Sequence, residues 1–142
     1  MIFIIINVLM ILNPTRVVAF YEDLPVTRDS RIKTYIYNKS EVFMLILHFG
    51  YQSHIEFAEG EVPQTISVGD SFAWKITPLE NRLFIRPLEK NIKTNMTIIT
   101  NKRTYQFDLV AKELEEGMEE DLVYQIRFFY PKKIGLANVQ RY

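Results

Sequence analysis

The chain has 142 residues, enough for one domain with a substantial core, and 48% of them are hydrophobic. It carries 17 basic and 17 acidic residues in no basic stripe, which excludes a surface that binds nucleic acid by neutralising phosphates. There is no cysteine, so thiol catalysis, disulfide bonds and most structural zinc sites are excluded as well.

The first nineteen residues predict a secretory signal peptide. Residues 2–12 are apolar apart from Asn7, a run of about half the length that a membrane-spanning helix needs. The sequence Val17-Val18-Ala19 then places small or apolar residues where a signal peptidase requires them, so we expect cleavage after Ala19 and a mature chain from Phe20. The only positive charge ahead of the apolar run is the amino terminus, which leaves an uncleaved anchor or a mis-assigned start as the alternative.

The first half of the mature chain predicts four strands. Arg31–Tyr37 alternates in polarity and forms the first. Val42–Phe49 is the most apolar run and is apolar on both faces, which predicts a central strand buried on both sides. A short strand follows over His54–Phe57, and Thr65–Val68 forms a brief edge strand.

After a turn at Gly69-Asp70, for which we expect positive φ, the residues Ser71–Thr77 alternate, with Phe72 and Trp74 on one face. Pro78 ends that strand. The next strand covers Leu83–Arg86 and is closed by Pro87.

The strongest local pattern is a β-hairpin over Asn95–Leu109, with its turn at Asn101-Lys102. Asn101 tolerates a left-handed backbone and Lys102 does so less easily, which leaves a loop longer than two residues as the alternative. In its second arm Tyr105, Phe107 and Leu109 share a face that we expect to be buried. A last strand covers Leu122–Phe129, and four of its residues share one face: Leu122, Tyr124, Ile126 and Phe128.

These patterns predict an all-β fold, a β-sandwich of about eight or nine short, mostly antiparallel strands. No helix pattern and no dividing linker interrupt the mature chain. We therefore expect one domain over residues 20–131, with residues 132–142 as a C-terminal tail or the remnant of an inter-domain linker.

Few side chains suggest chemistry. His54 and Glu56 share a strand face near Glu59, and with His48 they could begin a metal site; the alternative is a solvated face plus one satisfied core histidine. The acidic loop 113–121 could chelate calcium but lacks the ligand alternation of an EF-hand, so a solvated hairpin loop is favoured. We predict no metal and no cofactor.

Catalysis is not favoured either. Asp29 and Asp70 are carboxylates without a partner at a recognisable spacing, and a surface ion pair for Asp29 and an Asx-type turn for Asp70 account for both. No Gly-rich phosphate loop or nucleophile motif is present. Trp74 is expected in the core; exposed, it would anchor an interface. The surplus of apolar and aromatic surface favours assembly with other chains.

Several short motifs, in this order and spacing, resemble one family. They are Asp29-Ser30-Arg31-Ile32, Gly50, Ile55-Glu56-Phe57, Gly60-Glu61, Gly69-Asp70 with Trp74, Leu83–Pro87, Thr94–Thr97, Thr100–Arg103, Tyr105–Leu109, Tyr124–Phe128 and Tyr130-Pro131. The series is similar to the N-terminal domain of the CagX/TrbG family of conjugal transfer and type IV secretion subunits, over about residues 22–131. Nine residues in these motifs are candidate structural or interface positions: Arg31, Gly69, Asp70, Trp74, Asn95, Arg103, Tyr105, Tyr130 and Pro131.

The resemblance implies a periplasmic, envelope-associated subunit of the outer-membrane core complex, a location with which the predicted signal peptide agrees. It also implies a β-sandwich present in many copies in a ring, no catalysis, and neighbours that include the full-length homologue, a small outer-membrane lipoprotein and a subunit bridging to the inner membrane. Members usually continue into a second β-domain that contacts the lipoprotein. Because the sequence stops at Tyr142, lipoprotein binding is not carried over, and we expect an N-terminal-domain-only paralogue or a truncated product.

Three hypotheses follow. The first is a non-enzymatic structural subunit acting through protein contacts. The second is a free periplasmic module that binds a small ligand or carbohydrate, and the third is a hydrolase with an unrecognised site. Trp74 and Asp70 discriminate among them: packed in the core and in a turn they favour the scaffold, whereas lining a cleft they favour the binding module.

Overall fold

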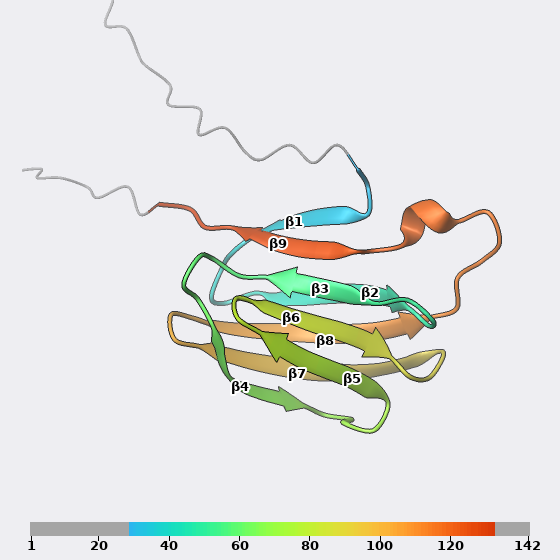
Figure 1. Cartoon of the computed structure of the whole chain (residues 1–142), viewed down its shortest axis with the longest axis horizontal. Helices are drawn as coiled ribbons and strands as arrows, with labels where there is room; N and C mark the ends of the chain where they lie inside the picture. Colours follow the sequence, from blue (N-terminus) through green and yellow to red (C-terminus); the bar gives the residue numbers. More distant parts are fainter. Residues whose placement is uncertain (1–28, 133–142) are drawn as a thin grey trace, which may run out of the picture.

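A computed structural model describes residues 29–132 of the chain (Figure 1). The predicted signal peptide and residues 133–142 of the predicted tail lie outside the described residues. Within the described part, no helix has the length and apolar character needed to cross a membrane. The described residues form nine strands and one short 3-10 helix: β1 (Ile32–Ile36), β2 (Val42–His48), β3 (Ser53–Glu56), β4 (Pro63–Val68), β5 (Trp74–Leu79), β6 (Arg82–Pro87), β7 (Ile92–Thr100), β8 (Thr104–Lys112), η1 (Glu119–Asp121) and β9 (Gln125–Phe129).

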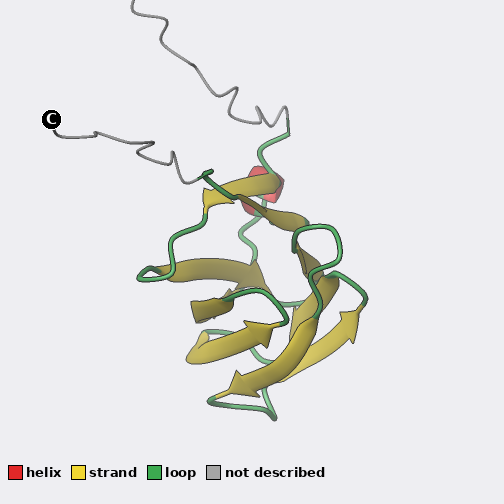
Figure 2. Ribbon diagram, turned by 90° about the vertical axis from the view of Figure 1, so that its left-hand side faces the viewer, coloured by secondary structure: helices red, strands yellow, loops and turns green. Residues whose placement is uncertain are grey.

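The strands form two sheets packed face to face, so the predicted all-β sandwich is confirmed (Figures 1 and 2). One sheet has the order β1-β9-β3-β6-β5 and the other has the order β2-β8-β7-β4. Four of the seven strand pairs are antiparallel, and three are parallel: β1 with β9, β2 with β8 and β3 with β9. Parallel pairs need crossover connections, and here the chain supplies them by passing between the sheets.

The predicted hairpin is confirmed as β7 and β8, with Ile99 opposite Thr104. The loop runs from Asn101 to Arg103 and is longer than two residues, as the poor fit of Lys102 left open, but neither Asn101 nor Lys102 has positive φ. Instead the hydroxyl of Thr100 accepts hydrogen bonds from the N–H groups of Lys102 (3.1 Å) and Arg103 (2.8 Å). A side-chain acceptor therefore shapes the turn.

The core lies between the sheets. Alternate residues of each strand point inward because successive side chains in a strand leave opposite faces. Tyr105, Phe107 and Leu109 of β8 are buried as predicted, together with Ile126 and Phe128 of β9. The other large buried side chains are Phe43, Leu45, Leu47, Ile55, Phe57, Trp74, Leu83, Ile85, Met96, Ile98 and Leu122.

The expectation for residues 42–49 is wrong in one respect. The segment forms β2, but β2 is an edge strand of its sheet and pairs only with β8. Its inward residues are buried, whereas Val42, Met44 and Ile46 are 55%, 55% and 37% exposed. Apolar residues on both faces predict burial on both sides only where another layer covers the second face, and no described element covers it here.

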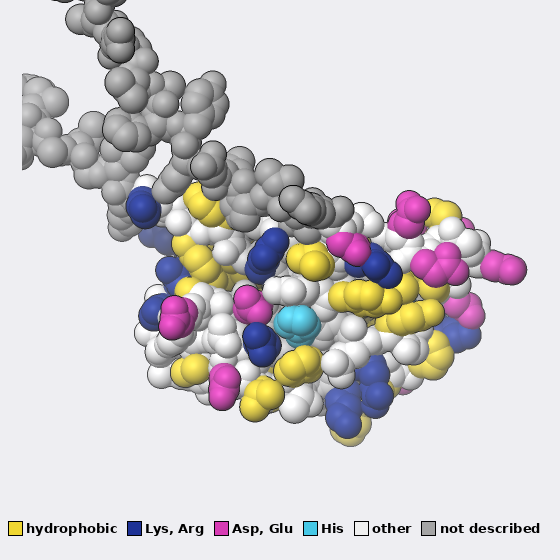
Figure 3. All heavy atoms as spheres, turned by 45° about the horizontal axis from the view of Figure 1, so that its top comes forward, with side chains coloured by type: hydrophobic (Ala, Val, Ile, Leu, Met, Phe, Trp, Pro, Cys, Tyr) yellow, Lys and Arg dark blue, Asp and Glu magenta, His cyan; other side chains and the backbone are white. Residues whose placement is uncertain are grey.

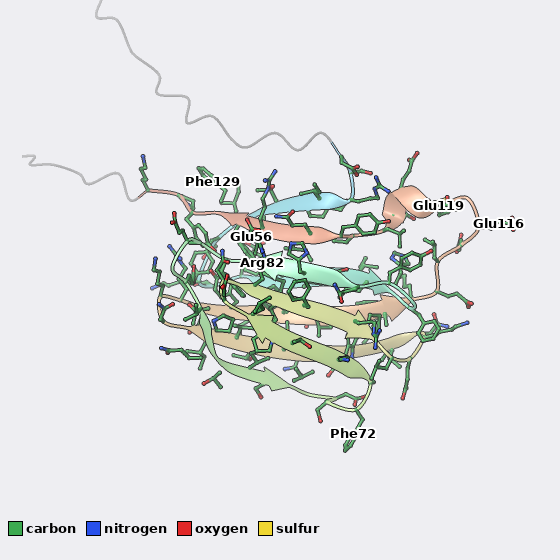
Figure 4. The ribbon with its side chains drawn as sticks, viewed as in Figure 1. Glu56, Phe72, Arg82, Glu116, Glu119 and Phe129 are labelled. Carbon is green, nitrogen blue, oxygen red and sulfur yellow. The ribbon has the colours of Figure 1, made fainter. Side chains whose placement is uncertain are left out.

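The residues before and after β5 also differ from the prediction. Phe72 is 91% exposed and points away from the sandwich (Figure 4), because it lies in the turn before β5 and not in the strand. Pro78 does not end the strand, which continues to Leu79. β5 is an edge strand, and a proline there removes no hydrogen bond that the sheet needs.

The last strand is shorter than predicted, because β9 begins at Gln125. Tyr124 lies before the strand and is exposed, so it does not share the face of Leu122, Ile126 and Phe128, which are buried. The acidic loop 113–121 is not a hairpin loop. It carries the chain from β8 in one sheet to β9 in the other and contains η1.

Candidate functional site

Three of the candidate residues, Arg103, Tyr105 and Tyr130, meet at one end of the sandwich, around the buried carboxylate of Glu61. One carboxylate oxygen accepts hydrogen bonds from the hydroxyls of Thr100 (2.8 Å) and Tyr105 (2.9 Å). The other accepts from the Arg103 guanidinium at 2.5 Å and from the backbone N–H of Ala58 at 3.3 Å. We call Glu61, Thr100, Arg103, Tyr105 and Tyr130 the Glu61 cluster.

Tyr130 completes the cluster. Its hydroxyl lies 2.8 Å from that of Tyr105, and its ring lies under the Arg103 guanidinium, 3.8 Å from ring centroid to guanidinium carbon. The Glu61 side chain is fully buried, whereas that of Arg103 is 26% exposed. A buried carboxylate is tolerated only with a cation and donors around it, and this cluster provides both.

The surroundings shift the acidity of the cluster. Burial is the main cause that raises the pKa of Tyr130, to about 12, and it also raises the pKa of Tyr105 well above its usual range. Burial alone would lower the pKa of Arg103, but the charge of Glu61 and the neighbouring tyrosines raise it. All three groups therefore hold their protons at neutral pH, which suits a structural cluster better than proton transfer.

An open groove of about 640 Å³ adjoins the cluster, and its lining includes Ile36, Tyr37, Arg103, Tyr130 and Pro131. We call it the Tyr130 groove. The ring of Tyr37 packs against that of Tyr130, with centroids 5.7 Å apart. The candidate Pro131 thus lies beside the other candidates at the point where β9 ends.

A second group of candidates lies where β4 ends and β5 begins. Asp70 forms the expected Asx-type turn: one carboxylate oxygen accepts from the N–H groups of Phe72 (3.1 Å) and Ala73 (3.2 Å). Gly69 does not have positive φ, contrary to the expectation. Its N–H donates to the carbonyl of Asn95 at 3.0 Å, and a Cβ on Gly69 would lie 2.6 Å from the side-chain oxygen of Asn95. Close approach of two strands accounts for this glycine.

Trp74 is buried in the core, as predicted. Its Nε1 has no hydrogen-bond partner within residues 29–132. Neither Trp74 nor Asp70 lines any of the described grooves. By the criterion set out from the sequence, both residues favour a scaffold over a ligand-binding cleft.

Arg31 lies apart from both groups. Its guanidinium donates to the carboxylate of Asp29 at 2.8 and 3.0 Å and lies 4.9 Å from the ring centroid of Tyr124. Hydrogen bonds from the Arg31 side chain and backbone hold the pKa of Asp29 well below its usual range. The expected surface ion pair is present, and it fixes the turn that leads into β1.

The candidate metal ligands do not converge. Glu56 forms an ion pair with Arg82 at 3.2 Å, and the two side chains lie together in Figure 4. The ring of His54 packs on Phe84, with centroids 5.4 Å apart, while His48 lies in the other sheet. Over residues 29–132, no three histidine or acidic residues group as metal ligands would.

The acidic loop likewise shows no converging carboxylates. Figure 3 shows acidic side chains gathered at one end of the molecule, and the labelled Glu116 and Glu119 point in different directions in Figure 4. Elsewhere on the face shown in Figure 3, basic and acidic side chains are interspersed. The loop is held through Lys90, whose ammonium lies 2.6 Å from Glu113.

Sequence reasoning missed Glu61 as a central residue. Its partners Thr100, Arg103 and Tyr105 lie about forty residues away in the chain, so no local spacing links them. The one signal was the Gly60-Glu61 pair among the family motifs.

The described residues form an all-β sandwich in which the carboxylates of Asp29, Glu56 and Glu61 each pair with an arginine of the same chain. A comparison with family models identifies the class of protein to which this sandwich belongs. The family model CagX, described as "Conjugal transfer protein", matches residues 30–139, so the chain belongs to the CagX family.

Curated relatives point to the same family. The chain is similar to "Type IV secretion system protein virB9" of Bartonella henselae, 31% identical over 127 residues, which cover 84% of this chain and 44% of that protein. It is 28% identical over 131 residues to "Type IV secretion system protein PtlF" of Bordetella pertussis, covering 80% of this chain and 48% of that protein. "Probable conjugal transfer protein TrbG" of Sinorhizobium fredii is 27% identical over 95 residues, which cover 60% of this chain and 33% of the relative. The chain thus spans less than half the length of these relatives.

Among solved structures, a chain described as "IG27 protein domain" aligns with 51% of this chain and 92% of its own length. The identity is 11% and the TM-score is 0.30. Nothing about function is concluded from this match.

Proposed function

We propose that this chain is a non-enzymatic structural subunit of a type IV secretion apparatus of the conjugation type, located in the periplasm and acting through contacts with other subunits. Family membership over residues 30–139 and the printed names of the relatives support the apparatus. The observation that carries the mode of action is the placement of Trp74 and Asp70 in core and turn, where neither serves a cleft.

The absence of enzymatic activity is part of the proposal. Asp29 is bound to Arg31, Asp70 caps a turn, and Glu61 is buried among four donors. None of these carboxylates has the exposed reactive partner that acid–base or nucleophilic catalysis needs. A kinetic screen with hydrolase substrates should give no turnover, and any reproducible activity abolished by Asp29→Asn or Asp70→Asn would refute this part.

The domain boundaries belong to the same proposal. Residues 1–19 are removed as a signal peptide, residues 20–131 form the β-sandwich domain, and residues 132–142 are a tail or linker remnant. The chain then reaches the periplasm and remains associated with the envelope through its partners.

The test is a crosslinking pull-down from detergent-solubilised envelopes, with a tag after Tyr142 and mass spectrometry of the recovered proteins. We expect the full-length homologue and the subunit that bridges to the inner membrane, and a peptide that begins at Phe20. Recovery of the chain alone and monomeric would refute the assembly role. A peptide that extends upstream of Phe20 would refute the cleavage site.

One observation favours the alternative, a free periplasmic module for a small ligand or carbohydrate. The Tyr130 groove is open, and Tyr37, Tyr130 and Arg103 give it aromatic faces and a guanidinium. Sugars pack on such surfaces. Titration of the purified domain with a panel of oligosaccharides, followed by the NMR signals of Tyr37 and Tyr130, distinguishes the two functions: saturable shifts favour the module and unchanged spectra favour the scaffold.

A further inference from the structure

The four sheet edges of the sandwich are not equally protected against pairing with another strand. β4 begins with Pro63 and has a register shift between Pro63 and Thr65. β5 carries Lys75 and Pro78, and the five-residue β1 carries Lys33. Prolines, bulges, lysines and short length are the devices by which edge strands avoid pairing. β2 has none of them: its seven residues pair with β8 in continuous register, without proline or lysine.

The free edge of β2 presents backbone groups that pair with no second strand of the described residues. In a parallel pair, alternate residues of a strand bond the neighbouring strand. The N–H of Phe49 donates to the carbonyl of Lys112, so the odd-numbered residues face β8 and Val42, Met44 and Ile46 direct their backbone groups outward. The carbonyl of Met44 accepts a hydrogen bond from the hydroxyl of Tyr35 (3.1 Å), which confirms this direction.

A groove of about 320 Å³ runs along this edge, between β2 and the opposing edge strand β1. Met44 and Ile46 line it from β2, and Tyr35 lines it from β1. These residues give the groove an apolar wall beside the outward backbone groups of β2, which is the combination that receives an extended chain.

The end of the groove carries charge and an unused polar atom. His48 lines it and is only 7% exposed, and its Nδ1 has no hydrogen-bond partner among the described residues. Lys33 and Lys112 line the same groove, against one carboxylate, that of Asp121. Neither lysine has an ion pair within residues 29–132. A buried nitrogen without a hydrogen-bond partner lowers the stability of the fold. A carboxylate brought by an occupant would accept a hydrogen bond from Nδ1 of His48.

We propose that β2 is a docking edge: an extended segment from another subunit of the assembly adds as a strand beside Val42–Leu47, with apolar residues at alternate positions and a carboxylate at the end near His48, Lys33 and Lys112. Backbone hydrogen bonds to β2 supply the affinity. The apolar wall and the two ammonium groups select the segment. This inference rests on the proposed function and names the surface through which it acts.

Two other occupants would fit the edge less well. A second copy of β2 carries one carboxylate, Glu41, just before the strand, so only an antiparallel pairing of the two copies would bring it near His48. Residues 20–28 of this chain do carry Glu22 and Asp23, but Pro25 interrupts their backbone donors. Both are outcomes that the experiment separates.

The first experiment places a photo-crosslinking amino acid at position 44 of the full chain in envelopes, with position 99 as the matched control. Ile99 is also exposed and lies in the same sheet, but on β7, away from the edge. We expect crosslinks from position 44 that map to one short segment of another subunit with alternating apolar residues and a carboxylate. Crosslinks to β2 of a second copy, to residues 20–28, or in equal amount from position 99 would overturn the proposal.

The second experiment uses Met44→Lys and its control Ile99→Lys, which add the same charge to the same sheet. Both positions are exposed, so both variants should fold, as checked by thermal unfolding. Burying an unpaired lysine in the interface should lower recovery of the chain in the complex about tenfold for Met44→Lys, and Ile99→Lys should change it less than about twofold. Equal recovery of the two variants overturns the docking edge while leaving the proposed function intact. If the wild-type chain itself is not recovered in the complex, the proposed function fails.

A third variant tests His48. His48→Phe keeps an aromatic ring and removes Nδ1. Binding of a synthetic peptide with the crosslinked sequence should weaken about tenfold, because a hydrogen bond to a charged group is lost. Unchanged binding of that peptide to His48→Phe, measured by calorimetry, would overturn the role given to the carboxylate.

Discussion

Replacing Arg103 by methionine removes the cation from the Glu61 cluster and leaves the carboxylate buried. Breaking a buried ion pair by deleting one partner costs about 3–5 kcal/mol. Three donors remain on Glu61: the hydroxyls of Thr100 and Tyr105 and the N–H of Ala58. They keep the expected loss in the free energy of unfolding near the lower limit, about 3 kcal/mol.

Glu61→Gln is the matched variant, because it keeps the shape and removes the other charge. The side-chain carbonyl of the glutamine can face Arg103, and its amide group can face the two hydroxyls, which are able to accept hydrogen bonds. Arg103 is 26% exposed and lies over the ring of Tyr130, so water can reach it once its partner is neutral. The expected loss is about 1–2 kcal/mol.

Urea unfolding measures both losses, and the single tryptophan, Trp74, reports the core by its fluorescence. We expect Arg103→Met to be less stable than Glu61→Gln at neutral pH and low salt. A larger loss for Glu61→Gln than for Arg103→Met would refute the reasoning, since it would mean that the exposed cation and not the buried anion needs its partner. The double variant serves as a control, because coupled residues give losses that do not add.

Three further predictions concern other parts of the sandwich. Burial raises the pKa of Tyr130 to about 12, whereas an unfolded tyrosine ionises near pH 10. The contribution of Tyr130 to the free energy of unfolding is therefore complete below about pH 10 and is lost as the pH rises to about 12. Tyr130→Phe should show a shallower alkaline decline in stability in unfolding titrations, and an unchanged decline would contradict this. Gly69→Ala places a Cβ 2.6 Å from side-chain oxygens of Thr94 and Asn95; it should lower the free energy of unfolding by about 1–2 kcal/mol in urea, and a neutral or stabilised variant would show that β4 and β7 can separate freely. Phe72→Ser should change thermal stability by less than about 0.5 kcal/mol because Phe72 is almost fully exposed, and a larger loss would place Phe72 in a contact that the monomer does not show.

The hairpin shows how much local sequence determines. The alternation of Tyr105, Phe107 and Leu109 fixed both the strand type and the buried face, and both were confirmed. The turn was not predictable in detail, because the Thr100 hydroxyl competes for the N–H groups that a left-handed turn would leave to the backbone. Side-chain acceptors of this kind change the turn without changing the strands beside it.

Phe72 and β2 show where periodicity misleads. Phe72 continues the alternation that includes Trp74, but the backbone N–H of Phe72 donates a hydrogen bond to the carboxylate of Asp70, which holds Phe72 in a turn. The prediction of a strand from the apolar run at β2 was correct. However, apolar residues on both faces do not distinguish a strand that its own domain covers from one whose second face is available to a partner. Sheet order depends on residues far apart in the chain, and the sequence of β2 alone does not contain it.

The candidate site was found in part. Arg103, Tyr105, Tyr130 and Pro131 came from the family motifs, and the structure brings them together at one end. Glu61, which joins them, was missed because its loop has no periodic pattern. Motifs can name the members of such a cluster, but only the fold shows which residue lies at its centre.

The position of β9 has a consequence for how the chain folds. β9 is the last strand in sequence, yet it lies between β1 and β3, the first and third. The five-stranded sheet therefore cannot form before residue 129 is available, and its pairing spans almost the whole domain. Contacts of such high sequence separation make folding slow. During synthesis from the N-terminus, the four-stranded sheet has all its strands by Lys112, whereas β1 and β3 lack the strand that joins them until β9 emerges.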